Sequence, residues 1–262
     1  MPIDSHCHLN YPGLVEDEAG VLARARAAGV RGLLNVATRP AEWPAVVGAA
    51  DRHADVWATV GVHPHEANAH ADLAVDDLVE AARHPRVVAI GETGLDYHDD
   101  RSDRAAQRQL FRRHLMAAQE LGLPVVVHSR DAEEDTVRLL AEAAARGPLA
   151  FVMHCFTGSP WLAHQALALG GYISFSGILT FRSAGALREV AAGLPADRLL
   201  VETDAPFLAP VPLRGRTCEP AFVVHTLQAL AQLKGEELAE LDRVTMANTC
   251  RLFRLAEAEC AS

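Results

Sequence analysis

Short apolar runs alternate with longer stretches of helical periodicity from one end of the chain to the other. This alternation is typical of repeated strand and helix units around a parallel sheet. Several runs are apolar throughout, such as Val125-Val126-Val127, as expected of strands that are buried on both faces. We predict eight strands, at residues 3–8, 32–36, 56–62, 87–91, 124–128, 150–154, 171–175 and 199–202.

The stretches between these runs have the apolar spacing of helices, for example at residues 16–28, 103–121, 133–146 and 161–169. In the second of them apolar side chains recur near i, i+3, i+4 and i+7, at Leu110, Phe111, Leu115, Ala118 and Leu121. We therefore predict an outer helix that packs its apolar face on a barrel. Gly170 and Gly171 predict a left-handed end to the helix before them, because glycine has no Cβ to oppose that conformation. The Pro-rich residues 206–220 predict an ordered loop after the last strand.

The length and composition of the chain agree with this pattern. A (β/α)8 barrel typically needs roughly 250 residues, and the chain has 262. Half of the residues are hydrophobic and 22% are charged, which provides enough apolar surface for a large core. We therefore predict an α/β protein, a (β/α)8 TIM barrel that occupies residues 1–262 as a single domain.

The N-terminal residues and the cysteines bear on the location of the protein. No basic segment followed by an apolar one opens the chain, and no apolar run approaches the roughly 18 residues that span a bilayer. The five cysteines are scattered and include no Cys-x-x-Cys pair, as in reduced proteins. We expect a cytoplasmic protein with no membrane partner and no obligate protein partner.

The charge and the histidine content point to the kind of site. A formal net charge of −10 argues against a broad basic surface that binds long duplex nucleic acid. A nucleic-acid substrate would therefore be held at a local site. The thirteen histidines indicate a metal centre, because histidine is the commonest metal ligand and several of them stand in short motifs.

Metal-ligating residue types follow the predicted strands at one end. His6-Cys7-His8 ends the first strand, where alternate residues point to the same side and two imidazoles can share one metal. In a TIM barrel the C-terminal ends of all strands open onto the rim where active sites lie. A single histidine at a strand end is more often structural, but packing does not explain six His, Glu and Asp residues at one rim. The further candidates at the ends of later strands are Glu92, His128, His154 and Asp204.

The candidate residues lie within longer motifs, which are Asp4-Ser5-His6-Cys7-His8-Leu9, Gly61-Val62-His63-Pro64-His65, Gly91-Glu92-Thr93-Gly94-Leu95-Asp96-Tyr97, His128-Ser129-Arg130-Asp131, His154-Cys155-Phe156-Thr157-Gly158 and Val201-Glu202-Thr203-Asp204-Ala205-Pro206. From residue 3 to residue 253 this set resembles the TatD family of metal-dependent deoxyribonucleases, within the amidohydrolase superfamily. The resemblance implies a (β/α)8 barrel, two divalent cations and hydrolysis of DNA phosphodiester bonds.

The resemblance also implies which residues hold the cations. Glu92 would bridge both, and a bridging carboxylate can hold two cations roughly 3.5–4 Å apart and help to activate a shared water. Asp204 would in addition accept the proton of that water as a general base. These ligand types suit Zn²⁺ or Mn²⁺, and the family is associated with Mg²⁺ as well. The implied ligands are His6, His8 and Asp204 for one cation, His128 and His154 for the other, and Glu92 for both.

A second group of residues is implied to bind substrate. The family pattern suggests that His63 contacts the substrate phosphate or the leaving group, and His65 shares its turn; ordering of the loop is an equally open role for both. Arg130 follows His128 within the motif of the fifth strand, and its planar donors suit a phosphate. Glu202 is expected to orient a ligand histidine of the first strand.

The cysteines near the motifs have structural interpretations. Cys7 and Cys155 should point into the barrel wall as small apolar residues, so we do not count them as ligands. Cys218 stands where family members commonly have Asn in the loop after the last strand. A thiol cannot replace the donors and acceptor of an amide, which affects the expected substrate contacts and not the metal centre.

Three functions remain to be compared. The first is a divalent-metal-dependent hydrolase of ester bonds that acts as a deoxyribonuclease on DNA, single-stranded or at strand ends. The alternative is an amidohydrolase-type hydrolase of an ester, lactone or aminoacyl ester, because an activated water attacks carbonyl carbon as well as phosphorus. The third is a non-catalytic barrel that stores metal, which would not need clustered phosphate-binding residues. The sequence favours the first.

Overall fold

Eight parallel strands form a nearly closed barrel in the part of the chain that the computed structural model describes, residues 2–99 and 101–255. The order of the strands in the sheet follows the chain, and a parallel bridge between Cys7 and Ala205 brings the two ends of the sheet together. The predicted (β/α)8 barrel is therefore confirmed. The strands are β1 Ile3–Cys7, β2 Gly32–Asn35, β3 Val56–Val60, β4 Val87–Asp96, β5 Val125–Arg130, β6 Phe151–Met153, β7 Tyr172–Phe175 and β8 Leu199–Val201.

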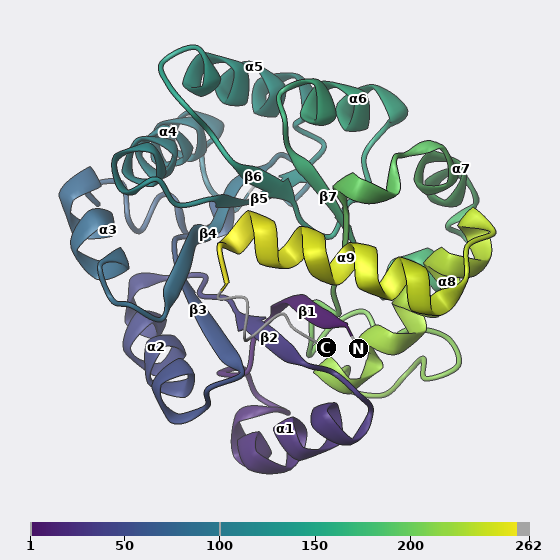
Figure 1. The fold of residues 1–262 in the computed structure, drawn as a ribbon. Coiled ribbons are helices and arrows are strands. Elements are labelled where there is room, and N and C mark those ends of the chain that lie inside the picture. The colour runs from purple at the N-terminus through teal and green to yellow at the C-terminus, as the bar shows by residue number, and fades with distance from the viewer. Residues whose placement is uncertain (1, 100, 256–262) are drawn as a thin grey trace.

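Helices surround the strands (Figure 1), with α1 to α8 around the outside and α9 across one end of the barrel. The four helices predicted from apolar spacing are α1, α4, α5 and α6, and each agrees with its predicted bounds to within two residues. The helices are α1 Glu18–Ala27, α2 Trp43–Arg52, α3 Val75–Ala82, α4 Arg104–Leu121, α5 Glu133–Ala144, α6 Pro160–Ala168, α7 Gly185–Gly193, α8 Val223–Lys234 and α9 Leu238–Phe253.

One predicted strand is wrong at its C-terminal end. The other seven strands agree with the prediction to within two residues at each end, but β4 continues to Asp96 instead of ending at residue 91. Residues 93–96 pair with residues 127–130 of β5, and this pairing extends the strand past the polar residues that end its apolar run. Glu92 therefore lies within β4 and not after it.

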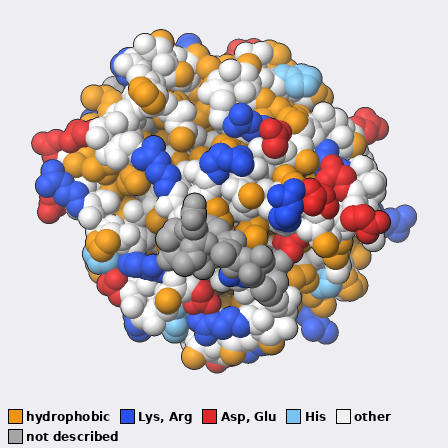
Figure 2. All heavy atoms as spheres, in the orientation of Figure 1, with side chains coloured by type: hydrophobic (Ala, Val, Ile, Leu, Met, Phe, Trp, Pro, Cys, Tyr) orange, Lys and Arg blue, Asp and Glu red, His pale blue; other side chains and the backbone are white. Residues whose placement is uncertain are grey.

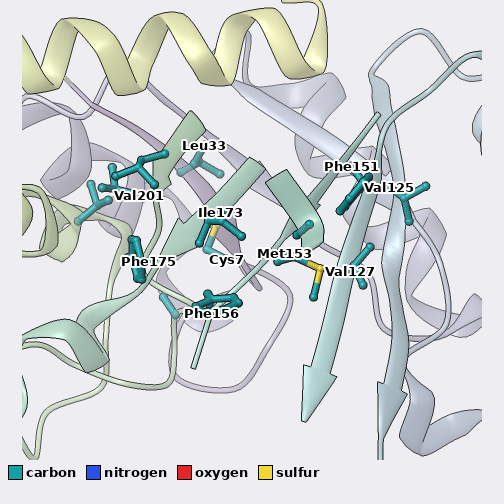
Figure 3. Close-up of a cluster of buried hydrophobic side chains, with 14 of the residues drawn as sticks. Cys7, Leu33, Val125, Val127, Phe151, Met153, Phe156, Ile173, Phe175 and Val201 are labelled. Carbon is teal, nitrogen blue, oxygen red and sulfur yellow. The ribbon is translucent and has the colours of Figure 1, made fainter. Parts of the chain in front are cut away.

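The apolar core has two layers, because alternate residues of a strand point to opposite sides. Val125 and Val127 belong to the outer layer, between the strands and the surrounding helices. Val126 belongs to the inner layer, inside the barrel, together with Leu252 and Phe253 of α9. Figure 3 shows side chains of this outer layer on β1, β2, β5, β6, β7 and β8.

Helix α9 closes the N-terminal end of the barrel. Besides its apolar contacts inside the barrel, Asn248 Nδ2 donates to the carbonyls of Ala196 and Leu199, both at 2.9 Å, at the start of β8. Figure 2 shows acidic and basic side chains interspersed on this closed end. The C-terminal ends of the strands are left for the site. Among the described residues no helix is long and apolar enough to cross a membrane.

The remaining predictions about loops agree with the structure where it describes them. Gly170 has φ +84°, in the left-handed region, after α6 ends at Ala168. Residues 206–219 form turns and irregular structure before the short 3-10 helix Pro220–Phe222. Cys260 and the other residues after 255 lie outside the described residues, so a single domain over residues 1–262 stays a prediction.

Candidate metal centre

The residues implied as ligands come together at the C-terminal rim of the barrel, at the end away from α9. They lie at a cavity of about 650 Å³, a volume typical of ligand sites. His6 is fully buried within the group. Those that line the cavity are His8, Glu92, His128, His154 and Asp204.

A register shift in β1 directs its two histidines into this site. Asp4 pairs with Leu33 and Cys7 with Asn35, so β1 has one more residue than β2 over this stretch. An extra residue reverses the alternation of side chains beyond it. Ile3 packs in the inner layer and Cys7 in the outer layer although both are odd-numbered. His6 and His8, on the other side of the chain from Cys7, therefore face the barrel axis.

A second register shift does the same for Glu92. Ile90 pairs with Val125 and Thr93 with Val127, so β4 also has one extra residue. The shift includes Gly91, whose φ of +151° favours glycine, and a Cβ there would lie 2.8 Å from the Cβ of Val126. The buried side chain of Glu92 thereby reaches the imidazoles of the site.

One group of ligand atoms lies around Oε2 of Glu92. This oxygen is 3.4 Å from Nε2 of His6 and 3.9 Å from Nε2 of His8. Oδ1 of Asp204 lies 3.6 Å and 3.4 Å from the same two nitrogens. The two nitrogens are 3.2 Å apart. The two histidines and Glu92 offer ligand atoms that all lie within 4.8 Å of one another, and Asp204 adds an oxygen beside both histidines.

A second group lies around the other oxygen of the same carboxylate. Oε1 of Glu92 is 2.8 Å from Nε2 of His154 and 3.1 Å from Nδ1 of His128. Nε2 of His63 lies 3.4 Å from this oxygen. Glu92 therefore presents one oxygen to each group, as a bridging carboxylate must.

The separations of the carboxylate oxygens from the histidine nitrogens are close to those expected around a divalent cation. Ligand atoms bound to one cation at about 2.0–2.2 Å lie about 3.0–3.6 Å from one another. The measured separations run from 2.8 Å to 3.9 Å. Imidazole nitrogen and carboxylate oxygen together suit Zn²⁺, Mn²⁺ or Mg²⁺.

Three of the histidines have a hydrogen-bond partner on the nitrogen that points away from Glu92. A neutral imidazole that donates from one nitrogen presents a lone pair on the other. Metal-ligating histidines usually have such a carboxylate or carbonyl partner, which sets both tautomer and ring direction. The pairs are His8 Nδ1 with the carbonyl of Val36 at 2.8 Å, His128 Nε2 with Asp96 at 3.0 Å, and His154 Nδ1 with Glu202 at 3.3 Å.

The two carboxylates of the site are ionised. Burial alone would raise the pKa of Glu92, but the charge of His154 and the hydrogen bonds of His128 and His154 outweigh burial and hold this pKa well below its usual range. Burial likewise opposes ionisation of Asp204, while its hydrogen bond to His8 and the nearby His6 lower its pKa overall. Both side chains can therefore neutralise the charge of a cation.

The hydrogen bond of His63 fixes its ring proton on the nitrogen that faces Glu92, the opposite of the arrangement in the three histidines above. Its Nδ1 accepts a hydrogen bond from the backbone N–H of His65 at 3.1 Å. The proton of the neutral ring is therefore on Nε2, the nitrogen that faces Glu92. Burial lowers the pKa of His63 to about 3, which keeps the ring neutral. His63 thus presents a donor to the site, whereas each of the other three would present a lone pair to a cation that displaces its second proton.

The other two residues implied to bind substrate lie on the wall of the same cavity. Nε2 of His65 is 3.1 Å from Oδ2 of Asp96. The Arg130 side chain is 48% exposed, and its Nη1 lies 3.8 Å from Oδ2 of Asp99. The guanidinium is therefore available at the mouth of the cavity.

Two expectations about neighbouring residues are wrong. Glu202 forms its hydrogen bond with His154 and not with a histidine of the first strand, although His6 offers an atom within 4.8 Å of it. Its Oε1 also accepts from the backbone N–H of Cys155 at 2.7 Å, which directs it to the residues after β6. Cys155 lines the cavity instead of packing in the barrel wall, since its φ of +42° breaks the alternation after β6. Cys7 packs in the outer layer as expected.

The loop cysteine does not take part in the cavity wall. Cys218 is fully buried, and its backbone N–H donates to the carbonyl of Pro206 at 3.0 Å. Cys218 is not among the described residues that line the cavity. Its observed role is to join the long loop to the turn after Asp204.

Two residues with clear roles in the site were missed by the sequence analysis. Asp96 accepts from His128 and stands in a quoted motif, which was the available signal. His114 lies within α4 and accepts a hydrogen bond at Nε2 from the backbone N–H of Val62, at 3.0 Å, directly before His63. Its place in the helical pattern gave no signal for this contact, since only the packing of α4 brings it to the turn.

Comparison with known proteins adds a family to this geometry. A family model described as TatD related DNase matches residues 3–254. The "Uncharacterized metal-dependent hydrolase YcfH" of Escherichia coli (strain K12) is 43% identical, over 97% of this chain and 96% of that protein. The "3'-5' ssDNA/RNA exonuclease TatD" of Klebsiella pneumoniae (strain 342) is 40% identical, over 90% of this chain and 92% of that protein.

A solved structure has the same fold over almost the whole chain. The crystal structure of YJJV, a TatD homologue from Escherichia coli, superposes with a TM-score of 0.91. It is 32% identical in sequence, over 97% of this chain and 98% of that one. The barrel and its strand order are therefore those of these relatives.

Proposed function

The chain belongs to the family of TatD-related DNases and is a metal-dependent hydrolase of ester bonds, and on this premise we propose that it is a deoxyribonuclease. Its proposed reaction is the hydrolysis of phosphodiester bonds in single-stranded DNA or at strand ends. The observation that carries the proposal is the Glu92 carboxylate, whose two oxygens face two separate groups of ligand atoms. Such a pair of sites suits an in-line displacement at phosphorus.

The proposal includes two divalent cations. His6, His8 and Asp204 would hold one cation with Oε2 of Glu92, and His128 and His154 would hold the other with Oε1. When bound, such cations withdraw electron density from water and from phosphate oxygens and neutralise developing negative charge. Zn²⁺, Mn²⁺ and Mg²⁺ are the candidates, and the donor set accepts each of them.

Asp204 is the proposed general base. Its carboxylate is ionised and is 15% exposed, so it reaches the cavity where water enters. It accepts the proton of the attacking water as the water oxygen bonds to phosphorus and the P–O bond to the sugar oxygen breaks, and a solvent water protonates the leaving oxygen. General-base assistance of this kind is typically worth roughly 10²–10⁴-fold in rate.

His63 is proposed to stabilise the reacting phosphate as a neutral donor. Its Nε2–H faces the second group of ligand atoms, and its low pKa excludes a protonated ring at neutral pH. A fixed neutral donor aimed at developing charge lowers the barrier without itself losing a proton. His65 and Arg130 extend the donor surface of the cavity toward the rest of the substrate.

Two observations favour DNA over a small ester or lactone. Arg101 and Arg130 line the cavity, and guanidinium groups suit phosphate better than a neutral carbonyl compound. A relative 40% identical to this chain has the name of a single-stranded DNA and RNA exonuclease. We infer from that name that RNA is a second substrate to test. The cytoplasmic location expected from the sequence stays a prediction.

The test is a substrate panel on metal-stripped protein to which Mg²⁺, Mn²⁺ or Zn²⁺ is returned. Single-stranded DNA, blunt duplex DNA and RNA, labelled at either end, are compared with an aryl ester and a lactone. We expect cleavage of single-stranded DNA that needs added cation and is lost in Asp204→Asn. The position of the label in the product gives the direction of attack. Hydrolysis of the ester or lactone with intact DNA would overturn the proposal.

A further inference from the structure

An aromatic side chain stands half exposed beside the candidate metal centre. Phe207 follows Asp204 by three residues, and its backbone N–H donates to the carbonyl of Asp204 at 2.9 Å. Phe207 is 50% exposed and lines the cavity. Of the exposed large apolar residues in the described part of the chain, it is the one that lines this cavity. Its position is therefore not explained by packing alone.

A second ring, Tyr11, connects Phe207 to the ligand groups. The rings of Tyr11 and Phe207 have centroids 6.0 Å apart and planes at 86°. Tyr11 stacks on His8, with centroids 4.7 Å apart and planes at 20°. The Tyr11 hydroxyl is 2.6 Å from Oγ1 of Thr38, which fixes the ring in its plane. We call Tyr11 and Phe207 the aromatic wall.

Two arginines line the cavity on the other side of the barrel. Arg101 follows β4 and Arg130 ends β5, and both are exposed. Phe207 and Tyr11 follow β8 and β1, which are joined at the Cys7 bridge. In a ring of eight strands in chain order, β4 and β5 lie opposite β8 and β1. The two arginines, which we call the basic wall, therefore face the aromatic wall across the ligand groups.

We propose that Phe207 is the stacking platform for one unpaired nucleobase of the substrate, and that Arg101 and Arg130 bind a neighbouring phosphate on the far side of the scissile bond. The inference rests on the proposed function and names the part of the nucleic acid that the site recognises. A single DNA strand bound across the cavity would place a base against the aromatic wall and a phosphate against the basic wall.

The chemistry of the two walls matches a single strand better than a duplex. Stacking on an aromatic ring accepts every base, because each base has a π face, and it contributes affinity without selecting sequence. A paired base is already stacked on its neighbours and must leave the helix before it can reach Phe207. Guanidinium groups bind phosphate through paired donors. An unpaired nucleotide can therefore stack its base on the aromatic wall while the basic wall binds a phosphate.

The experiment separates stacking from other roles of the ring. Wild type, Phe207→Ala and Phe207→Tyr are compared on a fluorescent single-stranded oligonucleotide and on analogues that lack one base, with the abasic position moved along the strand. Val211→Ala is the matched control, because Val211 is an exposed apolar residue outside this cavity. Cation binding and melting curves are measured for each variant.

We expect Phe207→Ala to raise KM on natural DNA about tenfold, with kcat, cation binding and melting unchanged. Phe207→Tyr should restore KM, because the ring is retained. At one abasic position wild type should show the same rise, and Phe207→Ala should add nothing to it. Equal KM in Phe207→Ala and Val211→Ala, or the same loss at every abasic position, would overturn the inference while leaving the nuclease proposal intact. Absence of cleavage by wild type with every cation would overturn the proposed function itself.

Discussion

At the scale of single residues, the site is specified by which nitrogen of each imidazole faces inward. His8, His128 and His154 have a partner on the outer nitrogen, while His63 uses Nδ1 to accept from His65. The same residue type would thereby offer a lone pair to a cation at three positions, and it offers a donor at the fourth. These hydrogen bonds support the proposed division between metal ligands and substrate donors.

Replacement of the proposed base should separate chemistry from binding. We expect Asp204→Asn to lower kcat by roughly 10²–10⁴-fold, because an amide does not accept the proton of the attacking water. KM for the oligonucleotide should change far less, since the aromatic and basic walls remain. Steady-state kinetics at saturating cation measure both. Asp197→Asn is the control, because Asp197 is an exposed acid in the short 3-10 helix Ala196–Arg198 before β8, at the end of the barrel away from the site. Near-normal turnover in Asp204→Asn would show that another group acts as the general base.

Replacement of Asp96 should weaken cation binding through His128. The Asp96 carboxylate holds Nε2 of His128 and also accepts the backbone N–H groups of His98 and Asp99. Loss of such a partner typically costs roughly 10–100-fold in metal affinity. We therefore expect Asp96→Ala to lower the affinity of one cation by this factor, with turnover recovered at high cation concentration. Asp96→Asn, which keeps an acceptor oxygen, should lose less.

Calorimetric titration with Mn²⁺ distinguishes this from a purely structural role of Asp96. A structural role would lower the melting temperature of Asp96→Ala and leave both cation affinities at their wild-type values. That result would contradict the prediction.

At the scale of secondary-structure elements, two strands and one helix orient the side chains of the site. The extra residues in β1 and β4 turn the side chains of His6, His8 and Glu92 inward. Helix α4 adds His114, which holds the turn before His63 through the N–H of Val62. These devices need backbone conformations and buried polar contacts that ordinary strands and helices do not have.

The close approach of β4 to β5 predicts that Gly94 cannot be replaced. Its φ is +134°, and a Cβ at this position would lie 2.0 Å from the carbonyl oxygen of His128. We expect Gly94→Ala to lower the free energy of unfolding by roughly 3 kcal/mol or more. Gly193→Ala is the matched control, since nothing lies within 4 Å of a Cβ there. Urea unfolding of both variants provides the comparison, and equal stabilities would contradict the strand geometry.

The buried histidine of α4 predicts that stability depends on pH. Burial lowers the pKa of His114 to about 4, so the folded state keeps the ring neutral while the unfolded chain titrates near its ordinary value of 6.5. Its contribution is therefore present above pH 6.5 and is lost as the pH falls toward 4. Between neutral pH and pH 5 the loss should be about 2 kcal/mol.

The measurement is urea unfolding of wild type and His114→Gln at several pH values. Glutamine does not titrate, so the variant should lose less stability than wild type as the pH falls through this window. Parallel pH profiles for the two proteins would show that His114 is not the group responsible.

At the scale of the whole molecule, a net charge of −10 coexists with a proposed nucleic-acid substrate. The barrel reconciles the two by placing Arg101 and Arg130 on one side of a single cavity. Binding should therefore involve few phosphates and should not depend on a charged outer surface.

This charge distribution predicts a weak salt dependence of binding. Each neutralised phosphate on a single strand contributes about −0.7 to the slope of log K against log salt. With one phosphate bound by the two arginines we expect a slope of about −0.7 for oligonucleotide binding to Asp204→Asn at constant cation concentration. Fluorescence anisotropy across a range of KCl concentrations measures it, with Arg130→Gln expected to reduce the slope by about half. A slope twice as steep or more would indicate a basic surface beyond these two residues.

The sequence by itself determined the repeated strand and helix pattern, the barrel class and the set of residues at one rim. Strand periodicity and the apolar faces of helices are local properties, so they can be read along the chain. The motifs around His6, Glu92 and Asp204 are local as well. The prediction failed for the end of β4, because pairing with β5 extends that strand beyond its apolar residues.

Only the tertiary structure decided how the rim residues face one another. Which oxygen of Glu92 meets which histidines depends on register shifts between neighbouring strands. The contacts of Glu202 with His154 and of His114 with Val62 join residues far apart in the chain. The opposition of the aromatic and basic walls follows from the closure of the ring between β8 and β1. These are relations between elements, and no local pattern of side chains contains them, because direction across a barrel is set by packing and register.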